Sequence, residues 1–256
     1  MFRLSAAIML TAVVGFHPTG APVTTASGSG VYRQTLPGVA WVVTAKPAAG
    51  QVRECEGTAW VADAKHRLLV TNHHVTDGAK AIRVYFPTAD NRGTVATSRD
   101  WYETNGPGIV GRVLAADPKK DLAVIQVDGL PGGVKELKLA GGSAEPGELA
   151  HTVGNSGSSQ SLWGYANGTV RAVYQMATRD GTFAGRVIES SVPAGPGASG
   201  SPILNAAGEV IGVVFANKPD ARRVTLSVDA AEVRVLLASA QAMARVNADG
   251  PGTLPR

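Results

Sequence analysis

The sequence predicts an all-β protein built as two six-stranded antiparallel β-barrels with one helix near the C-terminal end. Three observations predict it: the β-branched and apolar runs are short, Gly, Pro, Asn and Asp separate them, and they fall into two similar sets around a break at 129–136. The chain has 256 residues, of which 44% are hydrophobic, and this is enough for packed cores.

Six strands are expected before the break, at 39–46, 55–63, 67–72, 81–86, 109–117 and 122–128. Six more are expected after it, at 149–155, 161–174, 185–192, 201–205, 209–216 and 223–228. Within 161–174, Asn167-Gly168 predicts a hairpin turn, because this dipeptide favours positive backbone angles. The segment 87–108 is long for a hairpin connection, so its Trp101 and Tyr102 are expected either to contact a substrate or, as we favour, to pack on the first barrel.

The last predicted element is a helix that covers a barrel. Asp229 and Glu232 form a D-x-x-E capping pattern at its start. Apolar residues then recur on one helical face, at Val233, Leu236, Leu237, Ala240 and Met243. The segment 247–256 is rich in helix breakers and is expected to be a flexible tail.

The first 26 residues have the pattern of a secretory signal peptide. Arg3 precedes about a dozen uncharged residues, a stretch too short to span a bilayer. Small residues permit cleavage after Ala26, with Ala21 as a second site and an uncleaved N-terminal anchor as the other interpretation. We therefore expect an exported protein, periplasmic or secreted, without a membrane span in the mature chain. The expected domains are 1–26 as signal peptide, 27–130 as first barrel, 131–246 as second barrel with the helix, and 247–256 as tail.

The charge of the chain argues against a nucleic-acid partner, and its cysteine content excludes an intrachain disulfide. The formal net charge is only +4 and no basic cluster alternates with aromatic residues, so no nucleic-acid partner is expected. Cys55 is the only cysteine, which excludes an intrachain disulfide. We expect Cys55 to be a passive residue, because no partner or activating loop accompanies it.

The stretch "GPGASGSP" at 195–202 has three interpretations. Its glycines satisfy G-x-G-x-x-G, but a hairpin pattern follows where a dinucleotide site needs a helix, and this argues against phosphate binding. The stretch is then either a plain connection between strands or a loop that carries a nucleophilic serine.

A nucleophilic serine needs a base, and the base needs an acid to orient it. His73 and His74 lie at a strand end, and since adjacent residues of an extended chain face opposite ways, at most one should point into a site. The spacing of these two histidines gives little support for a zinc site.

Asp121 opens an apolar run and is a candidate acid. The other candidates are His17 in the leader, His66 and His151 in solvated or packing roles, and Asp117 and Asp128 in turns. Spacing alone leaves the choice open.

The blocks "TNHHV", "DPKKDLAV" and "GPGASGSPILNAAGEVIGV" resemble the three catalytic blocks of trypsin-like serine peptidases, nearest to the bacterial HtrA (Deg) protease domain. "GTAWV" is similar to that family's strand before the histidine. The order His, Asp, Ser is that of the chymotrypsin-like fold and differs from subtilisin and the α/β-hydrolases. The resemblance covers roughly residues 36–240.

This resemblance implies an exported serine endopeptidase that acts through an acyl-enzyme. Ser199 would be the nucleophile, His74 the general base with His73 as its main rival, and Asp121 the orienting acid. The backbone N–H groups of Gly197 and Ser199 would form the oxyanion hole. The expected partners are polypeptide substrates, unfolded proteins among them, and neither a cofactor nor a metal is expected.

The sequence departs from the family pattern at several points. Ala198 stands where digestive enzymes carry the Asp that pairs with a new N-terminus and where HtrA proteins usually carry Asn, and Ser201 replaces a Gly. No activation by a new N-terminus is therefore expected, and neither is regulation through a PDZ domain.

The resemblance places the specificity pocket at Pro193, Val214, Phe215 and Ala216. None of these residues carries a carboxylate, so we expect substrates with small or medium apolar side chains before the cut. Two alternatives stay open: a non-catalytic or partner-activated peptide-binding relative, and an esterase.

Overall fold

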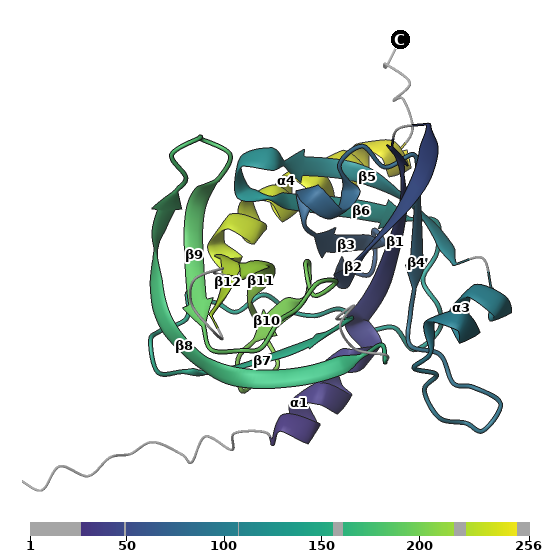
Figure 1. Cartoon of the computed structure of the whole chain (residues 1–256), viewed down its shortest axis with the longest axis horizontal. Coiled ribbons are helices and arrows are strands. Elements are labelled where there is room, and N and C mark those ends of the chain that lie inside the picture. The colour runs from purple at the N-terminus through teal and green to yellow at the C-terminus, as the bar shows by residue number, and fades with distance from the viewer. Residues whose placement is uncertain (1–26, 49, 107, 156–160, 218–223, 250–256) are drawn as a thin grey trace, which may run out of the picture.

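The computed structural model of the chain describes residues 27–48, 50–106, 108–155, 161–217 and 224–249. Within these ranges it forms two closed six-stranded antiparallel barrels and a long C-terminal helix (Figure 1). The predicted fold class is therefore confirmed. The predicted signal segment 1–26 and the last seven residues of the predicted tail lie outside the described residues. No helix within the described ranges is long and apolar enough to cross a membrane.

The first barrel closes in the order β1-β2-β3-β6-β5-β4. Its strands are β1 (Val39–Ala48), β2 (Gln51–Asp63), β3 (Leu68–Thr71), β4 (Ala81–Tyr85), β5 (Ile109–Asp117) and β6 (Leu122–Val127). Alternate residues of β1 face opposite ways: Ala40 and Val42 lie in the barrel interior, whereas Val39 and Trp41 belong to a core that both barrels share. The first half of β1 thus buries both faces, which explains its continuous apolar run.

The second barrel closes in the order β10-β11-β12-β9-β8-β7. Its strands are β7 (Leu149–Gly154), β8 (Gly164–Ala177), β9 (Ala184–Ser190), β10 (Pro202–Leu204), β11 (Val210–Asn217) and β12 (Thr225–Asp229). Leu204, Val213 and Val228 of this barrel join the shared core with β1 and β6 of the first. This packing holds the predicted His and Asp blocks of one barrel against the predicted Ser block of the other.

The predicted hairpin turn at Asn167-Gly168 is wrong. Both residues lie inside β8, where Asn167 pairs with His151 of β7. A Cβ atom at Gly168 would overlap the backbone at Ser191, so this glycine permits a close approach of two strands instead of a turn. The long β8 pairs with β7 along its first half and with β9 along its second, with a bulge between them.

Several short helices were not predicted. They are α1 (Gly28–Thr35), η1 (Leu36–Gly38), α2 (His73–Thr76), α3 (Arg99–Asn105) and η2 (Pro118–Lys120). The N-terminus of α1 is capped by Ser27, whose side chain accepts a hydrogen bond from the Gly30 N–H at 3.2 Å. The sequence does not predict α1, because its glycines and serine favour turns over helices.

The C-terminal helix α4 (Ala230–Asp249) crosses from the second barrel to the first and packs on β5 and β6 (Figure 1). Asp229 caps it, accepting from the Ala231 N–H at 2.7 Å. Glu232 does not complete the predicted capping pattern, because it accepts from the Arg186 N–H and pairs with Lys120. Of the predicted face, Val233, Leu237 and Ala240 are buried, Leu236 is partly buried and Met243 is exposed. The helix also continues three residues into the predicted tail.

The long connection between β4 and β5 packs on the first barrel through aromatic side chains. Tyr102 is buried, and its ring lies edge-on to those of Trp101, Trp41 and Trp163 at centroid distances of 4.8, 6.5 and 5.7 Å. These contacts agree with the packing interpretation of Trp101 and Tyr102.

Candidate active site

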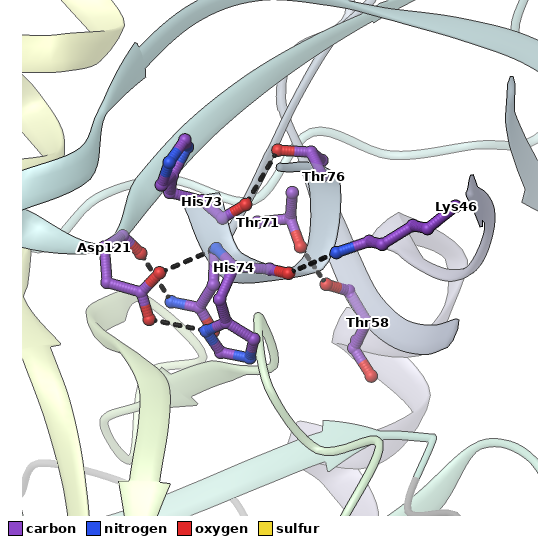
Figure 2. A network of polar contacts seen from close by, with 8 residues as sticks. Lys46, Thr58, Thr71, His73, His74, Thr76 and Asp121 are labelled. Atoms are coloured by element: carbon purple, nitrogen blue, oxygen red, sulfur yellow. Dashed lines mark hydrogen bonds and ion pairs between the residues drawn. The ribbon is translucent and has the colours of Figure 1, made fainter. Parts of the chain in front are cut away.

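The structure brings His74 and Asp121 together at one end of the first barrel (Figure 2). His74 Nδ1 lies 2.6 Å from Asp121 Oδ2, and the His74 backbone N–H donates to Asp121 Oδ1 at 2.8 Å. A carboxylate oxygen accepts, so Nδ1 carries the proton and Nε2 is left with its lone pair. His74 is half exposed and Asp121 is largely covered. The imidazole is thus oriented by the acid and open to a substrate.

Local backbone geometry holds Asp121 in this position. Asp121 follows η2 and has a left-handed conformation, with φ of 49°. Its carbonyl accepts from Asn72 Nδ2 at 2.8 Å, and Asn72 directly precedes α2. The first barrel therefore fixes the His and the Asp through main chain as well as side chain. Asn72 was missed in the sequence, where nothing distinguishes it from a turn residue.

His73 points away from this pair. Its Nε2 lies 3.7 Å from Asp77 Oδ1, and its Nδ1 is buried without a hydrogen-bond partner among the described residues. Both histidines lie on the single helical turn of α2, not on an extended strand end, so successive side chains point in different directions. The expectation that only one of them faces the site agrees with this geometry.

The serine block forms a tight turn between β9 and β10. The Ala198 N–H donates to the Gly195 carbonyl at 3.0 Å, Pro196 occupies the second position, and Gly197 has φ of 84°. These are the features of a type II turn, which requires a positive φ at its third residue. Glycine at 197 adopts this positive φ without the steric cost that a side chain would add.

Two N–H groups of this turn are left for a ligand. The N–H groups of Ala198, Gly200 and Ser201 all donate to backbone carbonyls, whereas those of Gly197 and Ser199 have no hydrogen-bond partner within the described ranges. They are the two predicted oxyanion donors. Backbone N–H groups that stay unpaired beside a partly exposed serine can stabilise a developing negative charge.

Ser199 and His74 are not hydrogen-bonded to one another in the described part of the chain. Their segments both approach Gly57, where an added Cβ atom would contact the side chain of Val75, the residue after His74, and the Ser199 carbonyl. In structures without substrate, catalytic hydrogen bonds are often long and tighten only on binding. The structure thus places the three predicted residues in one region and pairs two of them.

Of the predicted specificity residues, Pro193 lines a pocket of about 330 Å³ between the β7–β8 edge and the turn. Its other walls include Tyr165, Ala194 and Ala198. Val214 is buried in the second-barrel core, Phe215 stacks on Phe183 at 4.7 Å, and Ala216 does not line this pocket.

The remaining predicted histidines have other environments. His66, expected in solvent, is largely covered and its Nδ1 lies 2.8 Å from Asp63 Oδ2. His151 is buried and its Nδ1 lies 2.8 Å from the Tyr165 hydroxyl. Burial lowers the pKa of His151, because the charged imidazolium loses its hydration. Neither side chain contacts Ser199 or the His74–Asp121 pair.

Comparisons with known proteins place this geometry in a family. The family model described as a trypsin-like peptidase domain matches residues 57–213. A serine protease Do-like HtrB of Bacillus subtilis is 26% identical over 162 residues, which are 61% of this chain and 31% of that protein. The chain thus spans about a third of the length of this curated relative.

Solved structures of proteases have the same fold. The active form of the Rv3671c protease from M. tuberculosis superimposes with a TM-score of 0.67 at 23% identity, covering 91% of this chain and 93% of that one. The HtrA-type protease AlgW with a tripeptide gives a TM-score of 0.63 at 22% identity, covering 85% of this chain and 64% of that one. At these identities the likeness supports the two-barrel fold alone.

Proposed function

The chain belongs to the trypsin-like peptidase family, and from this premise we propose that it is a serine endopeptidase. Ser199 is the nucleophile, His74 the general base and Asp121 its orienting acid, while the Gly197 and Ser199 N–H groups form the oxyanion hole. The observation that carries the proposal is the combination of a paired His74 and Asp121 with two unpaired N–H groups beside Ser199.

The proposed reaction proceeds in two halves through an acyl-enzyme. His74 Nε2 takes the proton of the Ser199 hydroxyl as its oxygen attacks the peptide carbonyl. The carbonyl oxygen becomes negative and is held by the two N–H groups, each worth on the order of 3 kcal/mol of transition-state stabilisation. His74 then gives its proton to the leaving amine. In the second half, water attacks the acyl-enzyme carbonyl while His74 takes a proton from it. His74 then returns the proton to the Ser199 oxygen, and the acyl group is released as the acid.

Asp121 acts in this scheme by holding the imidazole. Its two oxygens bind both the ring Nδ1 and the backbone N–H of His74, so the ring has one orientation and one tautomer. The same contacts stabilise the imidazolium that forms during attack. The weak exposure of Asp121 strengthens this effect, since less water screens the pair.

We propose polypeptides as substrates, with small or medium apolar side chains before the cut. Described walls near the turn are uncharged, including Pro193, Ala194 and Ala198. The serine-protease name of the HtrB relative supports the peptide class. Export through the leader 1–26 remains part of the proposal: cleavage after Ala26 would leave Ser27 as first residue, still able to cap α1.

Peptide cleavage by the purified protein tests this function. We expect the wild type to cleave a mixed peptide library, with apolar residues enriched before the cut, and Ser199→Ala to lose this activity while keeping its thermal stability. Cleavage that persists in Ser199→Ala would contradict the assignment. Folded wild-type protein that binds peptides without cutting them would favour the peptide-binding alternative.

A further inference from the structure

Thr58 of β2 makes two hydrogen bonds to the turn that carries the proposed nucleophile. Its backbone N–H donates to the Ser199 carbonyl at 2.8 Å, and its hydroxyl donates to the Gly197 carbonyl at 3.2 Å. Thr58 is fully buried and belongs to the first barrel, whereas the turn belongs to the second. One residue thus holds the carbonyl groups of both proposed oxyanion donors from across the barrel interface.

The direction of the Thr58 hydroxyl proton is set by Asn155. The Asn155 backbone N–H lies 3.0 Å from Thr58 Oγ1 and can only donate. The hydroxyl oxygen therefore accepts from Asn155, and its single proton is free for the Gly197 carbonyl. A threonine hydroxyl that could rotate would hold this carbonyl less firmly.

Asn155 is itself held by Trp163, which directly precedes β8 and is bonded in turn to the connection between β4 and β5. Its Oδ1 accepts from the Trp163 N–H at 3.0 Å, and the indole Nε1–H of Trp163 donates to the Ala96 carbonyl at 2.9 Å. The Tyr102 hydroxyl donates to the same carbonyl at 3.0 Å. Trp163 is buried with φ of 62°, a costly conformation for a large side chain that its surroundings must maintain.

We propose that Thr58 is a positioning residue for the oxyanion hole and that the Asn155–Trp163 contacts set its hydroxyl. This inference rests on the proposed function and gives a role to Thr58, a residue of the "GTAWV" strand to which the resemblance assigned none. The carbonyls that Thr58 holds belong to the peptide units beside the two free N–H groups. Without the hydrogen bond from the Thr58 hydroxyl, the peptide group after Gly197 can change its orientation. The Gly197 N–H group then points less directly at the oxyanion of the transition state.

The test compares Thr58→Val with Thr58→Ser. Valine keeps the shape and removes the hydroxyl, whereas serine keeps the hydroxyl. We expect Thr58→Val to lower kcat about tenfold, which is what the loss of one neutral hydrogen bond can cost. KM should change little, because the oxyanion hole acts mainly on the transition state. Thr58→Ser should restore most of kcat. The affinity for a peptide aldehyde, which forms an oxyanion on binding, should fall with kcat, while the affinity for the cleaved peptide product stays the same.

Thr35→Val is the matched control. Thr35 is also fully buried, and its hydroxyl donates to the Val31 carbonyl within α1 and not to the turn. It should lose a similar amount of stability and keep wild-type kcat. Equal kcat in Thr58→Val and wild type, or equal losses in both valine variants, would overturn the proposal.

Hydrogen exchange separates this proposal from the proposed function. The Ala198 N–H, which is paired within the turn, should exchange faster in Thr58→Val than in wild type whether or not the protein cleaves peptides. Faster exchange in a protein without activity contradicts only the proposed function. Unchanged exchange at Ala198 contradicts the positioning role.

Discussion

At the scale of single residues, the site depends on the contact between His74 and Asp121. The 2.6 Å separation and the second bond to the His74 backbone give the imidazole one orientation. His73, its neighbour in sequence, has no contact with Asp121 and instead faces Asp77. Two residues of the same type thus have different environments, because successive side chains of a helix point about 100° apart.

Asp121→Asn tests the orienting role. Asparagine tolerates the left-handed backbone that Asp121 adopts, so the variant should fold. Its amide can donate to His74 Nδ1 and so favours the wrong tautomer, and we expect kcat to fall about ten-thousandfold. Peptide kinetics and thermal unfolding measure the two effects. His73→Gln is the control, and a loss of activity as large as that of Asp121→Asn would show that the wrong histidine was assigned.

The residues of the site were only partly predictable. The three sequence blocks carry Ser199, His74 and Asp121, because the proposed chemistry demands those residue types and the fold fixes their order along the chain. Thr58 and Asn72 are part of the same region, yet a buried threonine and a buried asparagine look like any polar residue of a strand or turn. Their roles arise from contacts between distant segments, which the sequence does not display.

At the scale of elements, α4 connects the two barrels near the site. Glu232 in its first turn pairs with Lys120, which directly precedes Asp121, and accepts from the Arg186 N–H at 2.9 Å. Burial alone would raise the pKa of Glu232, but the Lys120 and Arg186 contacts outweigh it and hold the pKa below its usual value. The charged form is therefore favoured in the folded protein.

Glu232→Gln should reduce stability in a pH-dependent way. Because the folded-state pKa of Glu232 is lowered, its contribution is present above the unfolded value of 4.5 and is lost as pH falls through the folded value. We expect a loss of about 1 kcal/mol near neutral pH that shrinks as the pH falls below 4.5. Denaturant unfolding of wild type, Glu232→Gln and the exposed control Glu145→Gln measures it. A loss independent of pH would contradict the ionic contribution.

The strands were more predictable than the turns and short helices. Apolar runs of β-branched residues locate the strands, and β5 (Ile109–Asp117) begins and ends where expected. The turn predicted at Asn167-Gly168 is wrong, because glycine at this position is required for the close approach of two strands and not for a positive backbone angle. The helix α3 escaped prediction because its seven residues carry no extended apolar period, and its aromatic residues are explained only by packing against Trp41 and Trp163.

At the scale of the whole molecule, the site exists only where the two barrels meet. Gly200 has φ of 87°, and an added Cβ atom would overlap the Thr58 carbonyl of the first barrel. The glycine therefore permits the approach that brings Ser199 toward His74. The interface depends on a glycine for both backbone conformation and space.

Gly200→Ala tests this dependence. The strained φ and the overlap together should lower the free energy of unfolding by about 3 kcal/mol and reduce activity at least tenfold, because the turn must move away from the first barrel. Gly50→Ala is the control: its φ of 81° is similar, but an added Cβ has open space around it. Denaturant unfolding and peptide kinetics give both quantities. Similar behaviour of the two variants would argue that the barrel contact is unimportant.

The most direct measurement of the central claim is labelling of the purified full chain with a fluorophosphonate, read by intact mass. Such a probe reacts with a serine only when the base and oxyanion hole are assembled. We predict one adduct on the wild type, and none on Ser199→Ala or His74→Ala. A folded wild type that takes no adduct, or an adduct that persists in Ser199→Ala, would contradict the proposed Ser199–His74–Asp121 site.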